Sequence, residues 1–240
     1  GSCMITPMKK VTILCLEKDK ETSLETLREM GVLHVTPLVN PTGVKLNAAK
    51  AKVLHVRKAL EAVPDKSNKE SLQVEKPVET VHELLSVRKN ATDEISKLRN
   101  DLLRFESFGN LDPKSIESLA EKGVFVKLYE VDAGKSISVD GEALVLPFGK
   151  NTNGMTYAVI SRNAPVSVNN AIEMPLPSLS LAEMRSGLEK ANAEIQKVED
   201  SLEGLATSRS QIVSELNSAS EELELQEVAG GMIGNSCITM

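Results

Sequence analysis

The strongest pattern in this sequence is a heptad repeat of apolar side chains in its C-terminal quarter. Between residues 181 and 223 the spacing alternates between three and four, and twelve of the thirteen positions are apolar. Side chains at this spacing share one face of an α-helix, so the pattern predicts one continuous coiled-coil helix over 181–225. These thirteen heptad positions are Leu181, Met184, Leu188, Ala191, Ile195, Val198, Leu202, Leu205, Arg209, Ile212, Leu216, Ala219 and Leu223.

Two earlier segments, 44–63 and 78–108, show the same alternation, and Pro64 and a polar loop over 65–77 separate them. At about 1.5 Å per residue they measure roughly 76 Å together, against about 67 Å for the helix over 181–225. The similar lengths predict an antiparallel coiled-coil hairpin, in which two outbound helices share one return helix. The apolar or interrupting positions are Leu46, Ala49, Val53, Val56, Leu60 and Val63, then Val81, Leu84, Arg88, Ala91, Ile95, Leu98, Leu102 and Phe105.

The N-terminal segment has the pattern of a βαβ unit. Residues 8–16 and 32–35 are aliphatic and β-branched runs of strand length. The short helix between them starts at a cap, Asp19 or Thr22, and ends near Gly31. Two parallel strands do not make a stable sheet, so further strands must join them, and the run 237–240 has the character of one.

The insert 109–177 has a different pattern. Asp112 and Pro113 mark a helix start, and Gly123 marks its end. Three strand-like runs follow at 124–130, 143–148 and 155–161, with turn residues between them. All six aromatic residues lie between 105 and 157, which predicts a small α/β lobe with an aromatic core.

The predicted fold class is therefore α+β: an elongated molecule with a long antiparallel coiled-coil hairpin and a small α/β lobe at each end. Four domains are expected. They are a proximal lobe over 4–43, completed in part by 229–240; outbound helices over 44–108; a distal lobe over 109–177; and a return helix over 178–228.

Composition and charge narrow the function. Aromatic residues make up only 2% of the chain, with no Trp, which favours long helices over a large compact enzyme core. The net charge is −6, with +4 over residues 1–77 (13 minus 9) and −7 over 178–240 (4 minus 11). An acidic chain is a poor match for a protein that follows nucleic-acid phosphates, so no nucleic-acid partner is expected. No apolar stretch approaches the about 18 residues that a membrane span needs.

The search for chemistry gives weak candidates only. The odd count of three cysteines, without CxxC spacing, indicates reduced cytosolic thiols, and Cys15 is expected to be buried in a strand. Gly134-Lys135-Ser136 lacks the first glycine of a phosphate loop. Asn90-Ala91-Thr92 matches a glycosylation sequon on an expected cytosolic helix. The isolated histidines are expected to pack or face solvent; they are His34, His55 and His82.

Arg88 and Arg209 occupy predicted helix-contact positions, where they either carry a buried functional charge, extend to solvent or fix the helix register. No catalytic, cofactor-binding or metal-binding residue is predicted, and the chain is not expected to be an enzyme.

The segment Pro7-Met8-Lys9-Lys10-Val11, followed by Leu27-Arg28-Glu29-Met30-Gly31-Val32-Leu33-His34-Val35, resembles the start of subunit I of the V-type (A/V-type) ATPases, the equivalent of eukaryotic subunit a. The order of elements is similar along the whole chain. In that family two α/β lobes joined by a coiled-coil strut precede a membrane half with the proton path. The membrane half and part of the first lobe are absent here, so the resemblance implies a truncated N-terminal cytoplasmic fragment.

The resemblance implies a non-catalytic stator at the cytoplasmic face of the membrane, soluble as this fragment. Its expected partners are peripheral stalk subunits (E/G-type heterodimers), bound through both lobes, and the membrane sector of the rotary ATPase, reached through the missing C-terminal half. Two alternatives stay open: a ferredoxin-like ligand-sensing or coiled-coil scaffold protein, and a DNA-associated coiled-coil protein, which the acidic return helix disfavours. Long apolar segments in the continuation of the natural gene would distinguish the first reading from the others.

Overall fold

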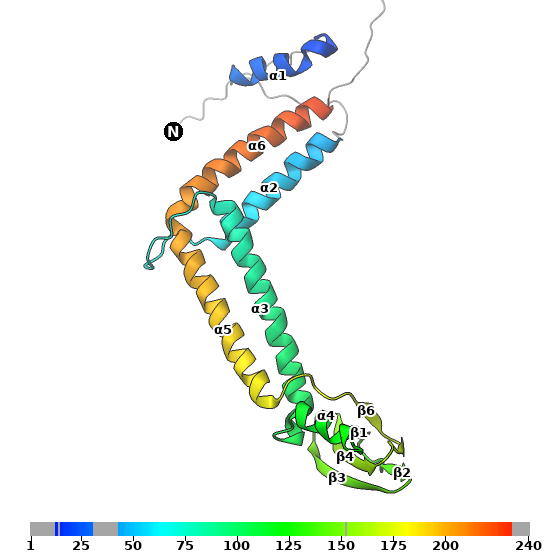
Figure 1. The fold of residues 1–240 in the computed structure, drawn as a ribbon. Helices are drawn as coiled ribbons and strands as arrows, with labels where there is room; N and C mark the ends of the chain where they lie inside the picture. Colours follow the sequence, from blue (N-terminus) through cyan, green and yellow to red (C-terminus); the bar gives the residue numbers. More distant parts are fainter. Residues whose placement is uncertain (1–12, 14, 31–42, 152, 232–240) are drawn as a thin grey trace, which may run out of the picture. The chain divides into compact units, whose positions relative to one another are not determined.

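A computed structural model describes residues 13, 15–30, 43–151 and 153–231 (Figure 1). These residues form long helices and antiparallel sheets, so the fold class is α+β. The chain divides into two units: one joins the described residues before 82 with those after 201, and the other comprises 82–201. In the described part of the chain, no helix is both long enough and apolar enough to cross a bilayer.

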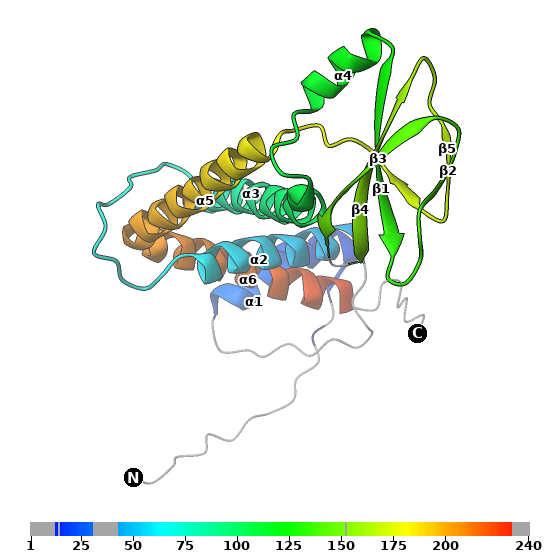
Figure 2. The ribbon, with the colours of Figure 1, turned by 90° about the horizontal axis from the view of Figure 1, so that it is seen from below.

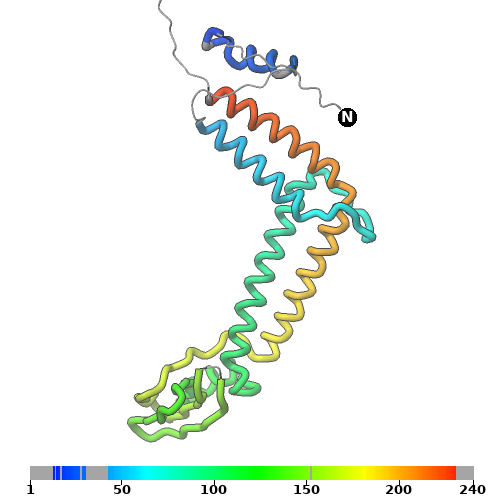
Figure 3. Tube along the Cα trace, turned by 180° about the vertical axis from the view of Figure 1, so that it is seen from behind, coloured from blue at the N-terminus to red at the C-terminus, as the bar shows by residue number. Residues whose placement is uncertain are grey.

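The first unit is built on two antiparallel helices, α2 (Val44–Ala62) and α6 (Arg209–Gly231), which lie side by side (Figures 1 and 3). The buried face of α2 consists of Leu46, Ala49, Val53, Val56 and Ala59. On the far side of α6 lies α1 (Lys20–Glu29), preceded by the 3₁₀ turn η1 (Glu17–Asp19). Lys20 Nζ donates to the Ala229 carbonyl over 2.6 Å. The predicted helices over 44–63 and before Gly31 are thus confirmed.

The predicted continuous helix over 181–225 is wrong in one respect, because it is broken near its middle. It consists of α5 (Leu181–Gly204), the 3₁₀ segment η3 (Leu205–Ser208) and α6. All thirteen heptad positions are nevertheless buried or half-buried. The periodicity therefore identified the buried face, while the break comes from contacts with the loop after α2, described below.

The helical part of the second unit is formed by α3 (Pro77–Phe105), which the 3₁₀ turn η2 (Glu106–Phe108) extends, and by α5. The two helices run side by side in Figures 1 and 3. A capping box begins α5: Ser180 Oγ donates to Glu183 Oε2 over 2.8 Å, and the Ser180 amide donates to the same oxygen over 2.8 Å. These bonds lower the pKa of the Glu183 carboxyl.

The rest of the second unit is a sheet with the strand order β3-β4-β1-β6, beside helix α4 (Pro113–Glu121). All neighbouring strands are antiparallel; Tyr129, for example, pairs with Tyr157 on one side and Glu173 on the other. The short strands β2 and β5 pair separately as a two-stranded ribbon (Figure 2). The bounds are β1 Val124–Asp132, β2 Ser138–Asp140, β3 Ala143–Lys150, β4 Gly154–Arg162, β5 Ser167–Asn169 and β6 Ile172–Met174.

One face of this sheet packs on the adjoining ends of α3 and α5. The core cluster consists of Leu98, Phe105, Phe108, Leu128, Ala158, Met174, Leu181 and Met184. The three predicted strands of the insert and its helix are confirmed. The aromatic core is confirmed in part, since Phe148 is 44% exposed and contacts Phe108 in a tilted arrangement with 5.4 Å between the ring centroids.

The predicted strands over 8–16 and 32–35 and the run 237–240 lie outside the described residues, apart from Ile13, Cys15 and Leu16. These three are not in a strand. The expected burial of Cys15 is wrong: its side chain is exposed, because the segment leads into η1 instead of a sheet, and nothing described covers the thiol. Cys3 and Cys237 are outside the described residues.

The cap of α4 gives a testable pH dependence. The Asp112 carboxylate accepts from Ser115 Oγ over 2.6 Å and from the Lys114 amide over 3.2 Å, and these hydrogen bonds lower its pKa from the ordinary value of 3.8. A carboxyl whose pKa is lower in the folded state stabilises the fold above its unfolded pKa, and that stabilisation is lost as the pH falls through the folded pKa. Thermal melts should therefore show the advantage of the parent over Asp112→Ala at pH 5 to 7, and a narrowing difference below about pH 4. Asparagine also caps a helix but does not titrate, so the difference between Asp112→Asn and Asp112→Ala should not narrow as the pH falls.

Candidate functional site

A connected polar site among the described residues of the first unit surrounds Arg209, where α2 ends and α6 begins. Pro64 stops α2 and has no N–H to donate, so the last carbonyl groups of that helix lack their usual helical donors, and the Leu60 carbonyl accepts only a long bond of 3.4 Å from the Val63 amide. The Arg209 Nη1 group donates to the carbonyl of Leu60 over 2.7 Å and also to that of Val63. Its Nε lies 2.6 Å from Asp65 Oδ1. A cation is also favourable at this end of a helix, because the helix dipole is negative there.

The polar loop over 64–76 lies against the broken helix and accounts for the break. The Leu72 amide donates to the carbonyl of Gly204 over 2.9 Å, which removes that carbonyl from the regular helical pattern. The hydroxyl groups of Ser71 and Thr207 lie 2.8 Å apart, and Gln211 Nε2 donates to the Glu75 carbonyl over 3.4 Å. We call this arrangement, residues 60–76 with 203–211, the joint.

Gly204 leaves room for the loop at the joint. A Cβ atom there would lie 2.9 Å from the Glu70 carbonyl oxygen and 3.2 Å from Leu72 Cβ, and the first of these is a backbone atom that cannot rotate away. A helical Gly→Ala change usually stabilises a protein by about 0.5–1 kcal/mol. Gly204→Ala should instead lower the melting temperature and raise amide exchange over 64–76.

Gly187→Ala is the matched control for that prediction. Its Cβ would lie 2.9 Å from Leu98 Cδ1, the end of a side chain that can shift, whereas the nearest atom at Gly204 is a backbone oxygen. We expect this change to cost less than Gly204→Ala. Equal effects of the two substitutions on melting temperature would contradict the role given to Gly204.

Arg88, the other arginine at a helix-contact position, lies in the second unit and has a simpler environment. Its Nη1 donates to Glu199 Oε1 over 2.9 Å, across the pair α3 and α5. The side chains are 40% and 43% exposed, so this is a partly solvated ion pair that helps to fix the register of the two helices. The alternative of a buried functional charge does not apply to Arg88.

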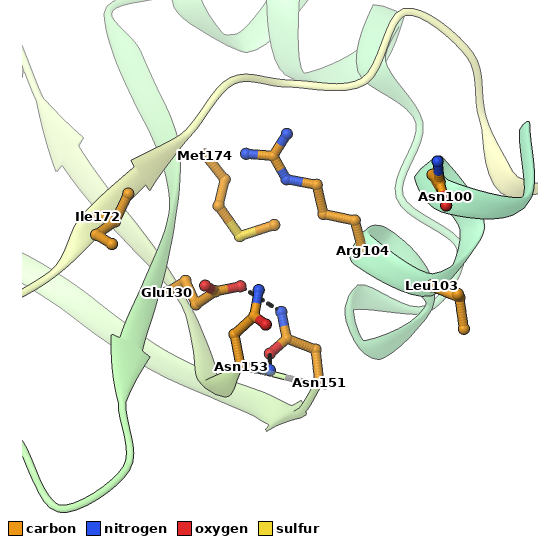
Figure 4. Close-up of a pocket in the computed structure, with 8 residues that line it drawn as sticks. All are labelled: Asn100, Leu103, Arg104, Glu130, Asn151, Asn153, Ile172 and Met174. Atoms are coloured by element: carbon orange, nitrogen blue, oxygen red, sulfur yellow. Dashed lines mark hydrogen bonds between the residues drawn. The ribbon is translucent and has the colours of Figure 1, made fainter. Parts of the chain in front are cut away.

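An open depression of about 330 Å³ lies where the end of α3 meets the sheet (Figure 4). The half-buried Glu130 carboxylate accepts a hydrogen bond from Asn151 Nδ2. The Arg104 guanidinium lies on the other side of Met174 in Figure 4, and 5.5 Å from the Phe105 ring centroid. A carboxylate and a guanidinium on opposite sides suit a small zwitterion. The depression is lined by Asn100, Leu103, Arg104, Glu130, Asn151, Asn153, Ile172 and Met174.

The remaining sequence candidates are scattered. Gly134 and Lys135 form a turn directly after β1, with Lys135 Nζ 2.6 Å from Asp132 Oδ2, and no helix follows as a phosphate loop requires. His55 is exposed on α2 and His82 half-buried on α3, while His34 is outside the described residues. Among the described residues no three His, Cys, Asp or Glu side chains are grouped as a metal site would need.

Sequence reasoning missed several residues of these sites. No local pattern marks these residues, because each contacts a segment distant in sequence or a turn. They are Asp65, Gly204, Glu130 and Asn151. The sequence did single out Arg88 and Arg209, each as a polar residue within a run of apolar heptad positions.

Comparison with known proteins shows a sequence similarity to one curated protein over half of the chain. The chain is 30% identical over 135 residues to "V-type ATP synthase subunit I 1" of Treponema pallidum (strain Nichols). The resemblance to V-type ATPase subunit I is confirmed. The match covers 50% of this chain and 21% of the relative, so the chain spans about a fifth of the length of that subunit I.

A solved structure described as the cytoplasmic N-terminal domain of subunit I, homolog of subunit a, of V-ATPase also matches, with 15% identity and a TM-score of 0.42. The match covers 89% of this chain and 87% of the chain in that structure. No family model matches the sequence.

Proposed function

We propose that this chain is a non-catalytic stator component of a rotary V-type ATPase or ATP synthase, the cytoplasmic part of the subunit whose membrane half supports ion transport. The observation that carries the proposal is the 30% identity to a subunit I over half of the chain. The long paired helices support it, since a stator must resist torque, and two packed helices bend less than one.

In the proposed stator, the chain is an elongated antiparallel coiled-coil hairpin with a lobe at each end. The four domains are 4–43 with 229–240, 44–108, 109–177 and 178–228. Small-angle scattering of the purified chain should give a maximum dimension well beyond that of a compact protein of 26.0 kDa. A compact protein of this size has a diameter of roughly 40–45 Å, and a value in that range would contradict the elongated hairpin.

In the proposed assembly, the two lobes bind peripheral stalk heterodimers of the E/G type at the cytoplasmic face of the membrane, and membrane association comes only through a C-terminal half. An affinity tag at residue 1 of the natural gene product tests this. Detergent extracts should yield the stalk subunits and the membrane ring together with the tagged protein. Recovery of the tagged protein without any rotary ATPase subunit would contradict the proposal.

Binding of purified stalk heterodimer to the chain, measured by calorimetry, is the second readout. Ile212→Asp, which disrupts the packing of α2 on α6, should weaken binding if the helices position the attachment surfaces. The exposed change Gln196→Glu is the control and should leave binding unchanged. In the ligand-sensing alternative, the chain would bind a small zwitterion at Glu130 and Arg104 and would not bind the stalk.

A further inference from the structure

Helix α2 has a second apolar stripe on the face that points away from α6. Val44 is 88% exposed and Leu54 is 63% exposed, with the exposed Ala48 and Ala51 between them. At 100° per residue these four positions fall within about a third of the helix circumference. The buried contacts with α6 use the opposite face. Figures 1 and 3 show α6 between α2 and α1, so α1 does not cover this stripe.

Basic side chains border the stripe. Within α2 there are five Lys or Arg residues and one acidic residue, Glu61, a net charge of +4 (5 minus 1). Only one of the five has an ion pair among the described residues, Lys45 with Glu21, and both of those side chains are more than 75% exposed. The other four form no ion pair or hydrogen bond within the described part of the chain; they are Lys50, Lys52, Arg57 and Lys58.

The undescribed stretches of the sequence supply no acid that could neutralise these four cations. The residues outside the described part, 1–12, 14, 31–42, 152 and 232–240, contain neither Asp nor Glu, and residues 1–12 add two lysines. The helix packed against α2 has the opposite charge: α6 carries five Glu and one Arg, a net −4 (1 minus 5). Its acidic residues leave these four cations unpaired. These four cations are therefore available to acidic groups of another molecule.

The kind of partner follows from the chemistry of the stripe. A membrane-binding helix inserts large apolar or aromatic side chains, whereas this stripe has one leucine, one valine and two alanines. Nucleic acid is disfavoured because the strongly acidic α6 lies directly behind α2, in a chain with a net charge of −6. Small apolar residues with charged neighbours are the pattern of a helix–helix contact, in which the flanking charges select the partner.

We propose that the outer face of α2 is a docking surface for an acidic amphipathic helix of another protein. Apolar residues of that helix pack against Val44, Ala51 and Leu54, and its Glu or Asp residues pair with Lys50 and Arg57 on one side and Lys52 on the other. This inference depends on the charges and exposure of α2, and it does not require the chain to be a stator.

The experiment uses the whole chain and a labelled synthetic peptide of four heptads, with Leu and Ala at the core positions and Glu at the flanking ones. Fluorescence anisotropy should show saturable binding that weakens as salt is raised. The double substitution Lys50→Glu with Arg57→Glu should weaken binding by at least about tenfold, and Leu54→Ser should weaken it by several-fold. Lys190→Glu with Lys197→Glu, two exposed positions on α5, is the matched control and should leave binding unchanged.

Three kinds of result would overturn the proposal. The first is a loss of charge specificity, seen either as equal binding of a peptide with Lys in place of Glu or as undiminished binding by the double α2 variant whose helical circular dichroism matches that of the parent. The second is co-sedimentation with vesicles of phosphatidylcholine and phosphatidylglycerol in the absence of peptide binding. The third is a dimer in analytical ultracentrifugation that the α2 substitutions dissociate, which would assign the surface to a second copy. If the acidic peptide binds α2 as expected while no stalk subunit co-purifies with the chain, the docking surface stands and the stator function does not.

Discussion

Replacing Ile212 with aspartate should separate α2 from α6 and unfold the first unit. The Ile212 side chain is completely buried on the face of α6 that packs on α2. The change removes buried apolar surface and places a carboxylate where it has no partner, so it should cost about 4 kcal/mol or more. That is a large part of the roughly 5–15 kcal/mol that stabilises a typical domain. Urea titrations followed by helical circular dichroism would measure it.

Val213→Asp is the control at the adjacent position. Val213 is 37% exposed, so a carboxylate there stays hydrated, and the expected cost is less than about 1 kcal/mol. Hydrogen exchange should show loss of protection in α2 and α6 for Ile212→Asp, with the sheet of the second unit still protected. Similar costs for the two substitutions would mean that the buried face of α6 is assigned incorrectly.

Arg209→Met should be the most damaging single change at the joint. It leaves the Val63 carbonyl without its Arg209 donor, and the Leu60 carbonyl with only the 3.4 Å bond from the Val63 amide, at a site where Arg209 is only 28% exposed. Leaving a buried carbonyl unsatisfied costs about 1–3 kcal/mol, so we expect a loss of about that size. Asp65 contributes little to this, because its side chain is 82% exposed and water solvates it.

Two comparisons make this prediction specific. Arg209→Lys keeps the charge and one donor group for the carbonyls but has no second nitrogen to pair with Asp65 at the same time, so its cost should be intermediate. Arg88→Met removes the other arginine at a helix-contact position, whose partner Glu199 is well solvated, and should cost less than about 1 kcal/mol. Thermal melts of the three variants would rank them, and a larger loss for Arg88→Met than for Arg209→Met would refute the capping role.

Local patterns predicted the elements that depend on local signals. The heptad spacing identified the buried faces of α2, α3, α5 and α6, because burial of one helix face requires that spacing whatever the partner is. Asp112 and Gly123 marked the ends of α4 correctly: Asp112 is a side-chain cap, and Gly123 has φ 76°, a value that glycine adopts without strain. The resemblance to subunit I also came from sequence alone.

The elements that the sequence did not reveal are held by distant segments. The strands β2, β5 and β6 are three residues long, too short for a periodic signal, and they exist because Val139 pairs with Val168 and Glu173 with Tyr129. The break at η3 arises from a loop about 136 residues away in sequence, which bonds to Gly204 and Thr207. The sequence by itself determined which faces are apolar and where most helices begin and end, since those depend on spacing and caps. Only the tertiary structure decided where the return helix breaks and which carbonyls Arg209 caps, because these depend on backbone groups brought together by folding.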